Sequence, residues 1–137
     1  MDPRLSFVTL AVGDVAATRA FYVDGLGWPA AYADDHVVMI QVGEHLVLSL
    51  WSEAGFEDEV GPVRRGPGLA PVTLSHNVPT RAEVDVALAE AGAAGATVVE
   101  AARERPWGGY SGYFADPDGF RWEVCWNPGE IGQVVLP

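Results

Sequence analysis

Residues 105–128, RPWGGYSGYFADPDGFRWEVCWNP, decide how this chain folds. At their centre, Asp116-Pro-Asp-Gly119 is a turn sequence, because proline presets φ and glycine supplies a positive φ. The flanking runs, 110–115 and 120–126, are rich in aromatic and β-branched residues. They are therefore predicted to be the paired strands of a hairpin.

Period-two alternation divides the second strand of this hairpin into two faces. Trp122, Val124 and Trp126 point one way, and Arg121, Glu123, Cys125 and Asn127 point the other. An acidic residue in mid-strand, with aromatic residues behind it, is the feature on which we place a site.

The first half of the chain, residues 5–51, predicts a strand, a helix and three strands. A strand over 5–12 leads to Asp14, the expected N-cap of a helix in which Ala17, Ala20 and Phe21 share one stripe. That helix ends near Gly25, which resembles a glycine C-cap. Three strands follow at 28–33, 36–42 and 45–51.

The second half, residues 70–128, repeats this plan after a linker over 52–69, for which one helical turn is considered. A strand over 71–78 precedes Thr80 and Glu83, which form a capping box. Val84, Leu88 and Ala91 follow at helical spacing, Gly92 ends the helix, and a strand over 96–101 leads into the hairpin.

The chain thus reads as two βαβββ modules in one domain over 1–137, with a tail at 129–137. Two similar halves indicate an internal duplication. Each half needs a helix on its sheet to bury an apolar face, so the predicted class is α+β.

Composition limits the partners of the chain. The net charge of −11, with arginine supplying every positive side chain, repels nucleic acid and anionic membranes and attracts cations. The other interpretation of this negative charge is that it only keeps the protein soluble. No apolar run approaches the roughly 20 residues of a membrane span, residues 1–4 show no secretory signal, and the single Cys125 excludes an internal disulfide. We expect a cytoplasmic protein.

The hairpin and the start of the chain together resemble the vicinal oxygen chelate superfamily, which includes glyoxalase I, extradiol dioxygenases and bleomycin- and fosfomycin-resistance proteins. Besides the Asp-Pro-Asp-Gly hairpin with its mid-strand Glu, the similar motifs are Phe7-Val-Thr-Leu-Ala-Val-Gly-Asp14, Phe21-Tyr22 and Gly25-Leu-Gly-Trp28. The resemblance covers residues 5–128. It implies that the two curled sheets form a cup backed by helices.

In metal-dependent members each half supplies two ligands, one on its first strand and one on its last. The resemblance places these positions at Phe7, near Val47, at Thr73 and at Glu123. Only Glu123 is a ligand-type residue, so neither a metal nor another cofactor is predicted. A relocated metal site built from His45 and Glu123 is the alternative. His36 and His76 are interpreted as structural residues.

The cup implied by the resemblance is amphipathic, as small-molecule sites usually are. Its donors and acceptors are Thr9, Thr73, Ser75, Asn77, Arg121 and Glu123, and its apolar walls are Phe7, Val47, Trp51, Trp107, Tyr110 and Tyr113. Trp107, beside two glycines, is either a strand-entry bend or a mobile rim. Glu123 either pairs with a neighbour such as Arg121, or acts as a general base or ligand anchor.

These features predict a metal-free protein that binds a small aromatic or cationic molecule, similar to the bleomycin-resistance proteins. The rival hypothesis is a glyoxalase-type lyase or isomerase with Glu123 as general base, so enzymatic activity stays open. The third hypothesis is an accessory domain whose only role is to dimerise. The resemblance also implies a homodimer.

Overall fold

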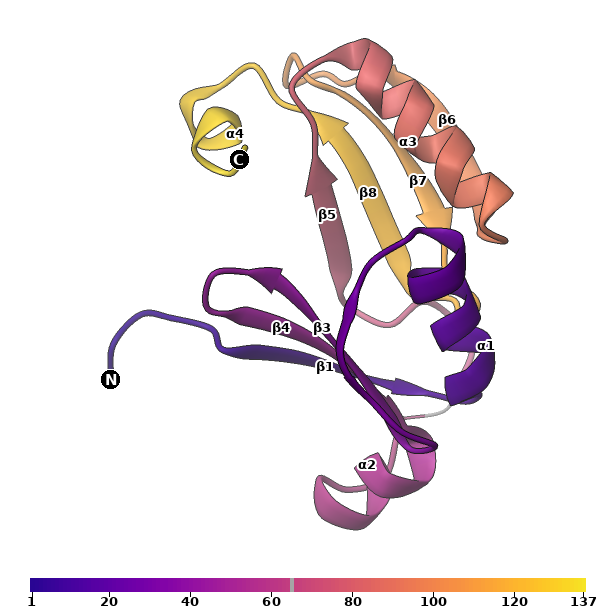
Figure 1. Ribbon diagram of the computed structural model, residues 1–137. Coiled ribbons are helices and arrows are strands. Elements are labelled where there is room, and N and C mark those ends of the chain that lie inside the picture. Colours follow the sequence, from indigo (N-terminus) through magenta and orange to yellow (C-terminus); the bar gives the residue numbers. More distant parts are fainter. Residues whose placement is uncertain (65) are drawn as a thin grey trace. The chain divides into compact units, whose positions relative to one another are not determined.

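The computed structural model describes residues 1–64 and 66–137; Arg65, within the predicted linker, lies outside the described residues. The chain forms two compact units, Met1–Pro67 and Gly68–Pro137. Each unit contains one four-stranded mixed sheet, curled but not closed, with helices packed on it (Figure 1). The predicted α+β class and the two modules are therefore confirmed.

The first unit runs strand, helix, three strands and helix. Its strands are β1 (Phe7–Val12), β2 (Ala30–Ala33), β3 (Val37–Gly43) and β4 (Leu46–Ser52); its helices are α1 (Val15–Arg19), the π-helix η1 (Ala20–Gly25) and α2 (Glu53–Glu59). The strand order is β1-β4-β3-β2, with β1 parallel to β4 and the other pairs antiparallel.

The second unit repeats this plan. Its strands are β5 (Thr73–Asn77), β6 (Thr97–Glu104), β7 (Tyr110–Ala115) and β8 (Arg121–Trp126), and its helices are α3 (Arg81–Ala93) and α4 (Glu130–Val134). The strand order β5-β8-β7-β6, with β5 parallel to β8, matches that of the first sheet. The same connectivity in both units supports the duplication read from the sequence.

The first helix begins as predicted but buries a different stripe. The Asp14 carboxylate accepts a hydrogen bond from the Ala17 amide (2.9 Å), which is the expected N-cap. Ala17 is exposed, however, whereas Thr18, Phe21 and Tyr22 are buried. The larger side chains occupy the core face because they remove more apolar surface from water than alanine does.

Both helix ends differ slightly from the prediction. The helix does end at Gly25, but the residue with a positive φ is Gly27, at 72°. In the second unit α3 continues through Gly92 to Ala93, and Gly95 adopts a φ of 110°. In each case the chain leaves the helix before the glycine that carries the left-handed conformation.

The predicted linker and tail contain more structure than expected. Ser52 caps α2, a helix of seven residues and thus longer than the one turn considered from the sequence. The tail forms the short helix α4, which the sequence did not predict. Within the described residues, no helix has the length and apolar character of a membrane span.

The core of the second unit lies between α3 and one face of its sheet (Figure 1). Val84, Leu88 and Ala91 of α3 are buried, as their spacing predicted. They cover Phe114 and Trp122, whose rings stack with centroids 6.0 Å apart. The alternation of β8 is thereby confirmed: Trp122 faces the helix, so Glu123 lies on the opposite face.

The Asp116–Gly119 turn that joins β7 to β8 forms as predicted. The Asp116 Oδ1 atom accepts hydrogen bonds from the amides of Asp118 (3.1 Å) and Phe120 (2.9 Å), and Gly119 has a φ of 87°. Because the turn fixes the hairpin register, it sets which side chains of the two strands face each other.

Candidate functional site

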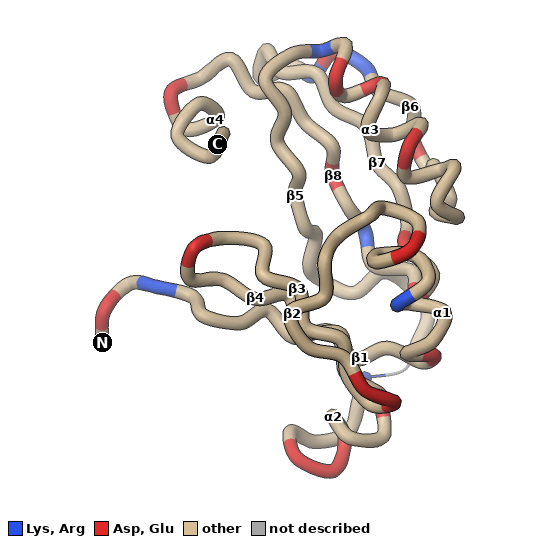
Figure 2. The backbone as a smooth tube through the Cα atoms, viewed as in Figure 1, with Lys and Arg blue, Asp and Glu red and all other residues tan. Residues whose placement is uncertain are grey.

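The sheet face opposite α3 carries a row of polar side chains across all four strands of the second unit. The registers place Ser75 beside Glu123, Glu123 beside Tyr113, and Tyr113 beside Glu100. The strand β8 begins at Arg121 and contains Glu123, and its tube in Figure 2 carries a basic band followed by an acidic band.

Glu123 is held by two hydroxyl groups from neighbouring strands. The Tyr113 hydroxyl donates to one carboxylate oxygen (2.9 Å) and the Ser75 hydroxyl donates to the other (3.4 Å). Burial, with the hydrogen bond to Glu123, raises the pKa of Tyr113 above its ordinary value. Tyr113 is therefore a protonated donor at neutral pH. Of the neighbours considered for Glu123, Arg121 is not its partner; Tyr113 and Ser75 are.

Arg105 extends this network on the β6 side. Its guanidinium donates to both carboxylate oxygens of Glu100 (3.1 and 3.2 Å) and to the Ser111 hydroxyl (2.8 Å) and carbonyl (2.9 Å). It also lies 5.3 Å from the centroid of the Tyr113 ring. With its side chain only 10% exposed, Arg105 fixes the positions of Glu100 and of the tyrosine that holds Glu123.

Glu100 is shared between two arginines. Arg103 adds a hydrogen bond of 2.6 Å to those of Arg105, and hydrogen bonding to these two guanidinium groups lowers the pKa of Glu100 to about 2. The Glu100 pairing raises the pKa of Arg105 in turn. This cluster keeps its charges throughout the physiological pH range.

Sequence reasoning missed the Glu100–Arg103–Arg105 cluster. Simple alternation puts Glu100 on one strand face and both arginines on the other. The register of β6 against β7 shifts on both sides of Glu100, and bulges of this kind change which face a side chain reaches. The only sign of this cluster in the sequence was that Glu100 lies within five residues of two oppositely charged arginines.

An open pocket of about 410 Å³ adjoins the Tyr113 end of this row. Its polar lining consists of Thr73, Glu100, Tyr113 and Arg121, and its apolar lining consists of Leu69, Ala70, Val72 and Val99. All eight residues belong to the second unit, so this pocket is a property of that unit alone.

Six of the predicted site residues share this one sheet face: Thr73, Ser75, Asn77, Tyr113, Arg121 and Glu123. The Thr73 hydroxyl donates to the carbonyl oxygen of Arg121 (3.1 Å), and Asn77 lies opposite the buried Cys125. Burial raises the pKa of the Cys125 thiol, which leaves it a packing residue.

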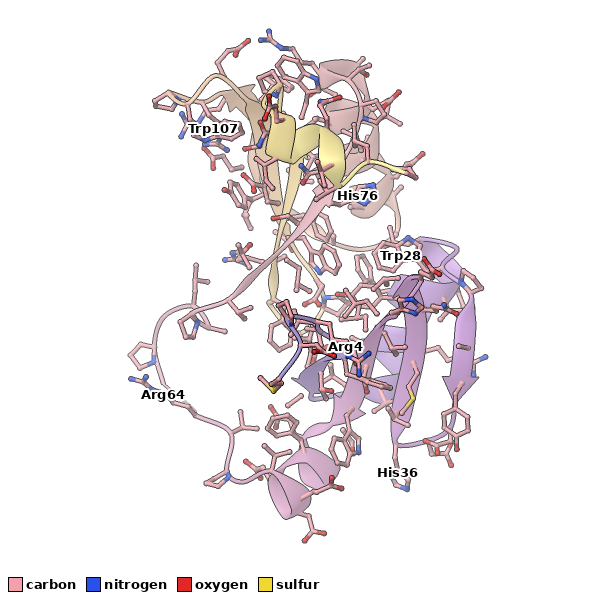
Figure 3. All side chains as sticks on the ribbon, turned by 90° about the vertical axis from the view of Figure 1, so that its left-hand side faces the viewer. Arg4, Trp28, His36, Arg64, His76 and Trp107 are labelled. Carbon is pink, nitrogen blue, oxygen red and sulfur yellow. The ribbon has the colours of Figure 1, made fainter. Side chains whose placement is uncertain are left out.

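Tyr110 is not part of this face, so its predicted place in the cup wall is wrong. Its hydroxyl donates to Asp85 of α3 (3.0 Å), and the Arg81 guanidinium lies 5.9 Å from its ring centroid. Trp107 sits in the turn between β6 and β7 (Figure 3), 53% exposed, with its indole folded against Gly109.

The other four predicted site residues, Phe7, Thr9, Val47 and Trp51, lie in the first unit. The register pairs Phe7 with Val47, and Thr9 lies on the same face of that sheet. Trp51 packs edge-on against Phe56 of α2 (centroids 6.2 Å apart), so part of its surface is used within its own unit.

The strand registers correct one predicted ligand position. Counting back from the two helix N-caps makes Phe7 the counterpart of Thr73, as expected. In the parallel pairs, however, Phe7 lies opposite Val47 and Thr73 lies opposite Arg121. The counterpart of Val47 is therefore Arg121, and not Glu123.

The position equivalent to Glu123 in the first unit is Ser49. The antiparallel pairs agree, since Met39 lies opposite Ser49 just as Tyr113 lies opposite Glu123. Ser49 is buried. The four ligand positions implied by the resemblance thus carry Phe7, Ser49, Thr73 and Glu123.

The three histidines lie in exposed positions. His45 lies 3.6 Å from its neighbour Glu44 and is 83% exposed, and His36 projects from the turn before β3 (Figure 3). His76 lies on β5, opposite Val124. Across residues 1–64 and 66–137, no three His, Cys, Asp or Glu side chains are grouped so that they could hold a metal ion.

Comparison with known proteins agrees with the observed fold. The family model described as Glyoxalase/Bleomycin resistance protein/Dioxygenase superfamily matches residues 4–124. No curated protein matches the chain.

Solved structures share the fold over nearly the whole chain. A glyoxalase-related enzyme from Fulvimarina pelagi is 31% identical, with a TM-score of 0.85 over 93% of this chain and 90% of its own. The hypothetical protein SA1046 from S. aureus is 26% identical, with a TM-score of 0.76 over 93% and 95%. Lactoylglutathione lyase from Agrobacterium tumefaciens, at 24% identity and a TM-score of 0.70 over 92% and 95%, shares the fold alone.

Proposed function

Because this chain belongs to the Glyoxalase/Bleomycin resistance protein/Dioxygenase superfamily, we propose that it binds a small aromatic or cationic molecule without a metal. The observation that carries the proposal is the setting of Glu123. It is the one acidic residue at the four ligand positions, and its carboxylate is held by Tyr113 and Ser75 next to an open pocket.

The pocket has the dimensions and chemistry of a small-molecule site. Its volume of about 410 Å³ falls within the roughly 300–1,000 Å³ typical of such sites. Apolar side chains and a few converging polar groups line it, which is the usual combination for binding and orienting an organic ligand.

Glu123 supplies an anchor for a ligand's donors. A carboxylate offers about four lone-pair positions, and Tyr113 and Ser75 use two of them. Because strands on both sides fix its oxygens, a bound ammonium or hydroxyl group would meet a carboxylate that is already oriented.

The residues present do not fit the metal centre of the metal-dependent relatives. Phe7 has no donor atom, and the hydroxyls of Ser49 and Thr73 are weak ligands for a divalent ion. Glu123 alone would have to hold such an ion against water, and it already accepts two hydrogen bonds. The proposed function therefore uses no metal ion.

The second candidate is a lyase or isomerase in which Glu123 removes a proton from a carbon next to a carbonyl. Glu123 is half-buried on the sheet face that carries the pocket, and this position favours the second candidate, because a general base must be within reach of its substrate. The similarity to a glyoxalase-related enzyme at 31% identity supports the same class. The protonated Tyr113 hydroxyl would be the neighbouring donor.

A binding assay with matched variants tests both candidates. Aromatic and aromatic-cationic compounds are titrated by calorimetry into the wild type, Glu123→Gln and Glu90→Gln. Glu90 is an exposed residue of α3, so its variant changes the net charge equally without touching the proposed site. We expect cationic compounds to bind Glu123→Gln about tenfold more weakly than the wild type, in line with the loss of one charge-assisted hydrogen bond. Their affinity for Glu90→Gln should equal that for the wild type.

Failure of every compound in such a set to bind would contradict the proposal. Turnover of the hemithioacetal of glutathione and methylglyoxal, lost in Glu123→Gln and retained in Glu90→Gln, would favour the enzyme instead.

A further inference from the structure

Among the described residues, Arg121 differs from the other arginines of the second unit in having no acidic partner. Arg81 pairs with Glu104, and Arg103 and Arg105 both pair with Glu100. The guanidinium of Arg121 reaches only the Gly119 carbonyl, at 3.5 Å, among the described residues. In a chain of 19 acidic and 8 basic side chains, an arginine left without a carboxylate retains its binding capacity for a ligand.

This arginine lines the pocket described above, next to apolar side chains that are open to solvent. Leu69, Val72 and Val99 are 63%, 44% and 43% exposed, and all three line the same pocket as the guanidinium. A cation beside an uncovered apolar wall suits a molecule with an anionic end and an apolar body.

The other charges at this pocket leave room for an anion. Glu100 is neutralised by Arg103 and Arg105, and Glu123 is not among the residues that line the pocket. The sheet face therefore carries three arginines against two acids, opposite in sign to the chain as a whole. The distant acidic residues are screened over about 8 Å at physiological salt, whereas charges that line the pocket act at contact.

We propose that this pocket binds the carboxylate of a small apolar acid, with Arg121 as its anchor and Leu69, Val72 and Val99 against its body. The inference rests on the proposed small-molecule function and narrows its ligand to an aromatic acid in preference to a cation. Guanidinium suits this role because its planar fork matches the two oxygens of a carboxylate. The hydrogen bond from Thr73 to the Arg121 carbonyl ties the start of β8 to β5, so the anchor stands on a fixed strand.

Three probes of similar size and different charge test this assignment. Phenylacetate, phenylacetamide and phenethylamine are titrated by calorimetry and by amide NMR shifts into the wild type, Arg121→Gln and Arg81→Gln. Arg81 lies on α3, on the other side of the sheet, and its substitution changes the net charge by the same amount. Melting temperatures of the variants are compared so that a folding defect is recognised.

We expect the wild type to prefer phenylacetate to phenylacetamide by about tenfold, with shifts at Thr73, Val99, Tyr113 and Arg121. Arg121→Gln should remove that preference and leave phenylacetamide binding unchanged, while Arg81→Gln should keep the preference. Equal binding of phenylacetate and phenylacetamide, or a preference that survives in Arg121→Gln, would overturn the inference and leave the small-molecule function standing. Stronger binding of phenethylamine would overturn it in favour of the cationic ligand, and no binding of any probe would count against both proposals.

Discussion

At the scale of single residues, Glu100 shows how a surface carboxylate becomes part of a fixed network. Arg105, the larger contributor, and Arg103 together lower the pKa of Glu100 to about 2 from 4.5. Arg105 also contacts the Tyr113 ring and both polar groups of Ser111. The position of the hydroxyl that binds Glu123 thus depends on an ion pair one strand away.

We predict that the contribution of Glu100 to stability depends on pH in the acidic range. A carboxyl whose pKa is lower in the folded state stabilises the fold above its unfolded pKa, and that stabilisation is lost as pH falls from about 4.5 towards 2. The difference in unfolding free energy between the wild type and Glu100→Gln should therefore be largest near neutral pH and shrink across this window. Urea denaturation at several pH values measures it. A difference that stays constant from neutral pH down to the lower limit of this window would contradict the role given to the two arginines.

At the scale of elements, Gly112 allows three segments to meet. A Cβ atom there would lie 2.8 Å from the Glu100 carbonyl oxygen, 2.8 Å from the Ala102 amide and 2.6 Å from a methyl group of Leu88. Two of these contacts are backbone atoms of β6, which cannot move without disturbing the sheet. Close packing of β7 against both β6 and α3 therefore requires glycine at this position.

Gly112→Ala should accordingly destabilise the protein by about 1–3 kcal/mol, the usual cost of forcing extra volume into a packed interior. Gly66→Ala is the matched control, because a Cβ atom there meets nothing within 4 Å. We expect that substitution to change the unfolding free energy by no more than about 0.5 kcal/mol. Chemical denaturation of both variants tests the prediction, and equal stabilities would show that β6 and β7 are less tightly packed than described.

At the scale of the whole molecule, the duplicated modules no longer carry matching chemistry. The second sheet retains Glu123 with its polar row, whereas the equivalent position of the first sheet is the buried Ser49. Phe7, at a position where the resemblance implies a metal ligand, presents an apolar side chain that is 52% exposed. The polar row is therefore present in the second module and absent from the equivalent position of the first. The homodimer implied by the resemblance stays a prediction.

We therefore predict that the protein purifies without a stoichiometric divalent ion and that chelator leaves its melting temperature unchanged. A ligand that binds only the folded state would raise the melting temperature, so removal of a resident metal would lower it. Elemental analysis and thermal melts with and without chelator measure both quantities. About one equivalent of zinc, nickel, manganese or iron, lost on Glu123→Ala, would refute the prediction.

Local patterns were sufficient for much of the fold. Turn chemistry at Asp116–Gly119, the N-cap at Asp14 and the helical spacing of Val84 and Leu88 each depend on residues a few positions apart. Alternation along β8 placed Trp122 in the core and Glu123 on the other face for the same reason. The same rule would have separated Tyr110 from Tyr113, since residues three apart on a regular strand face opposite sides.

What the sequence by itself determined is the pair of βαβββ modules and the face on which Glu123 lies, because both follow from short-range periodicity and turns. Only the tertiary structure decided that Ser49 corresponds to Glu123, since that requires the register of parallel strands whose partners are distant in the chain. It also decided that Arg105 joins the site, because bulges in β6 change the phase of the alternation. That Arg121 is left without an acidic partner likewise depends on which side chains the folded sheet brings together.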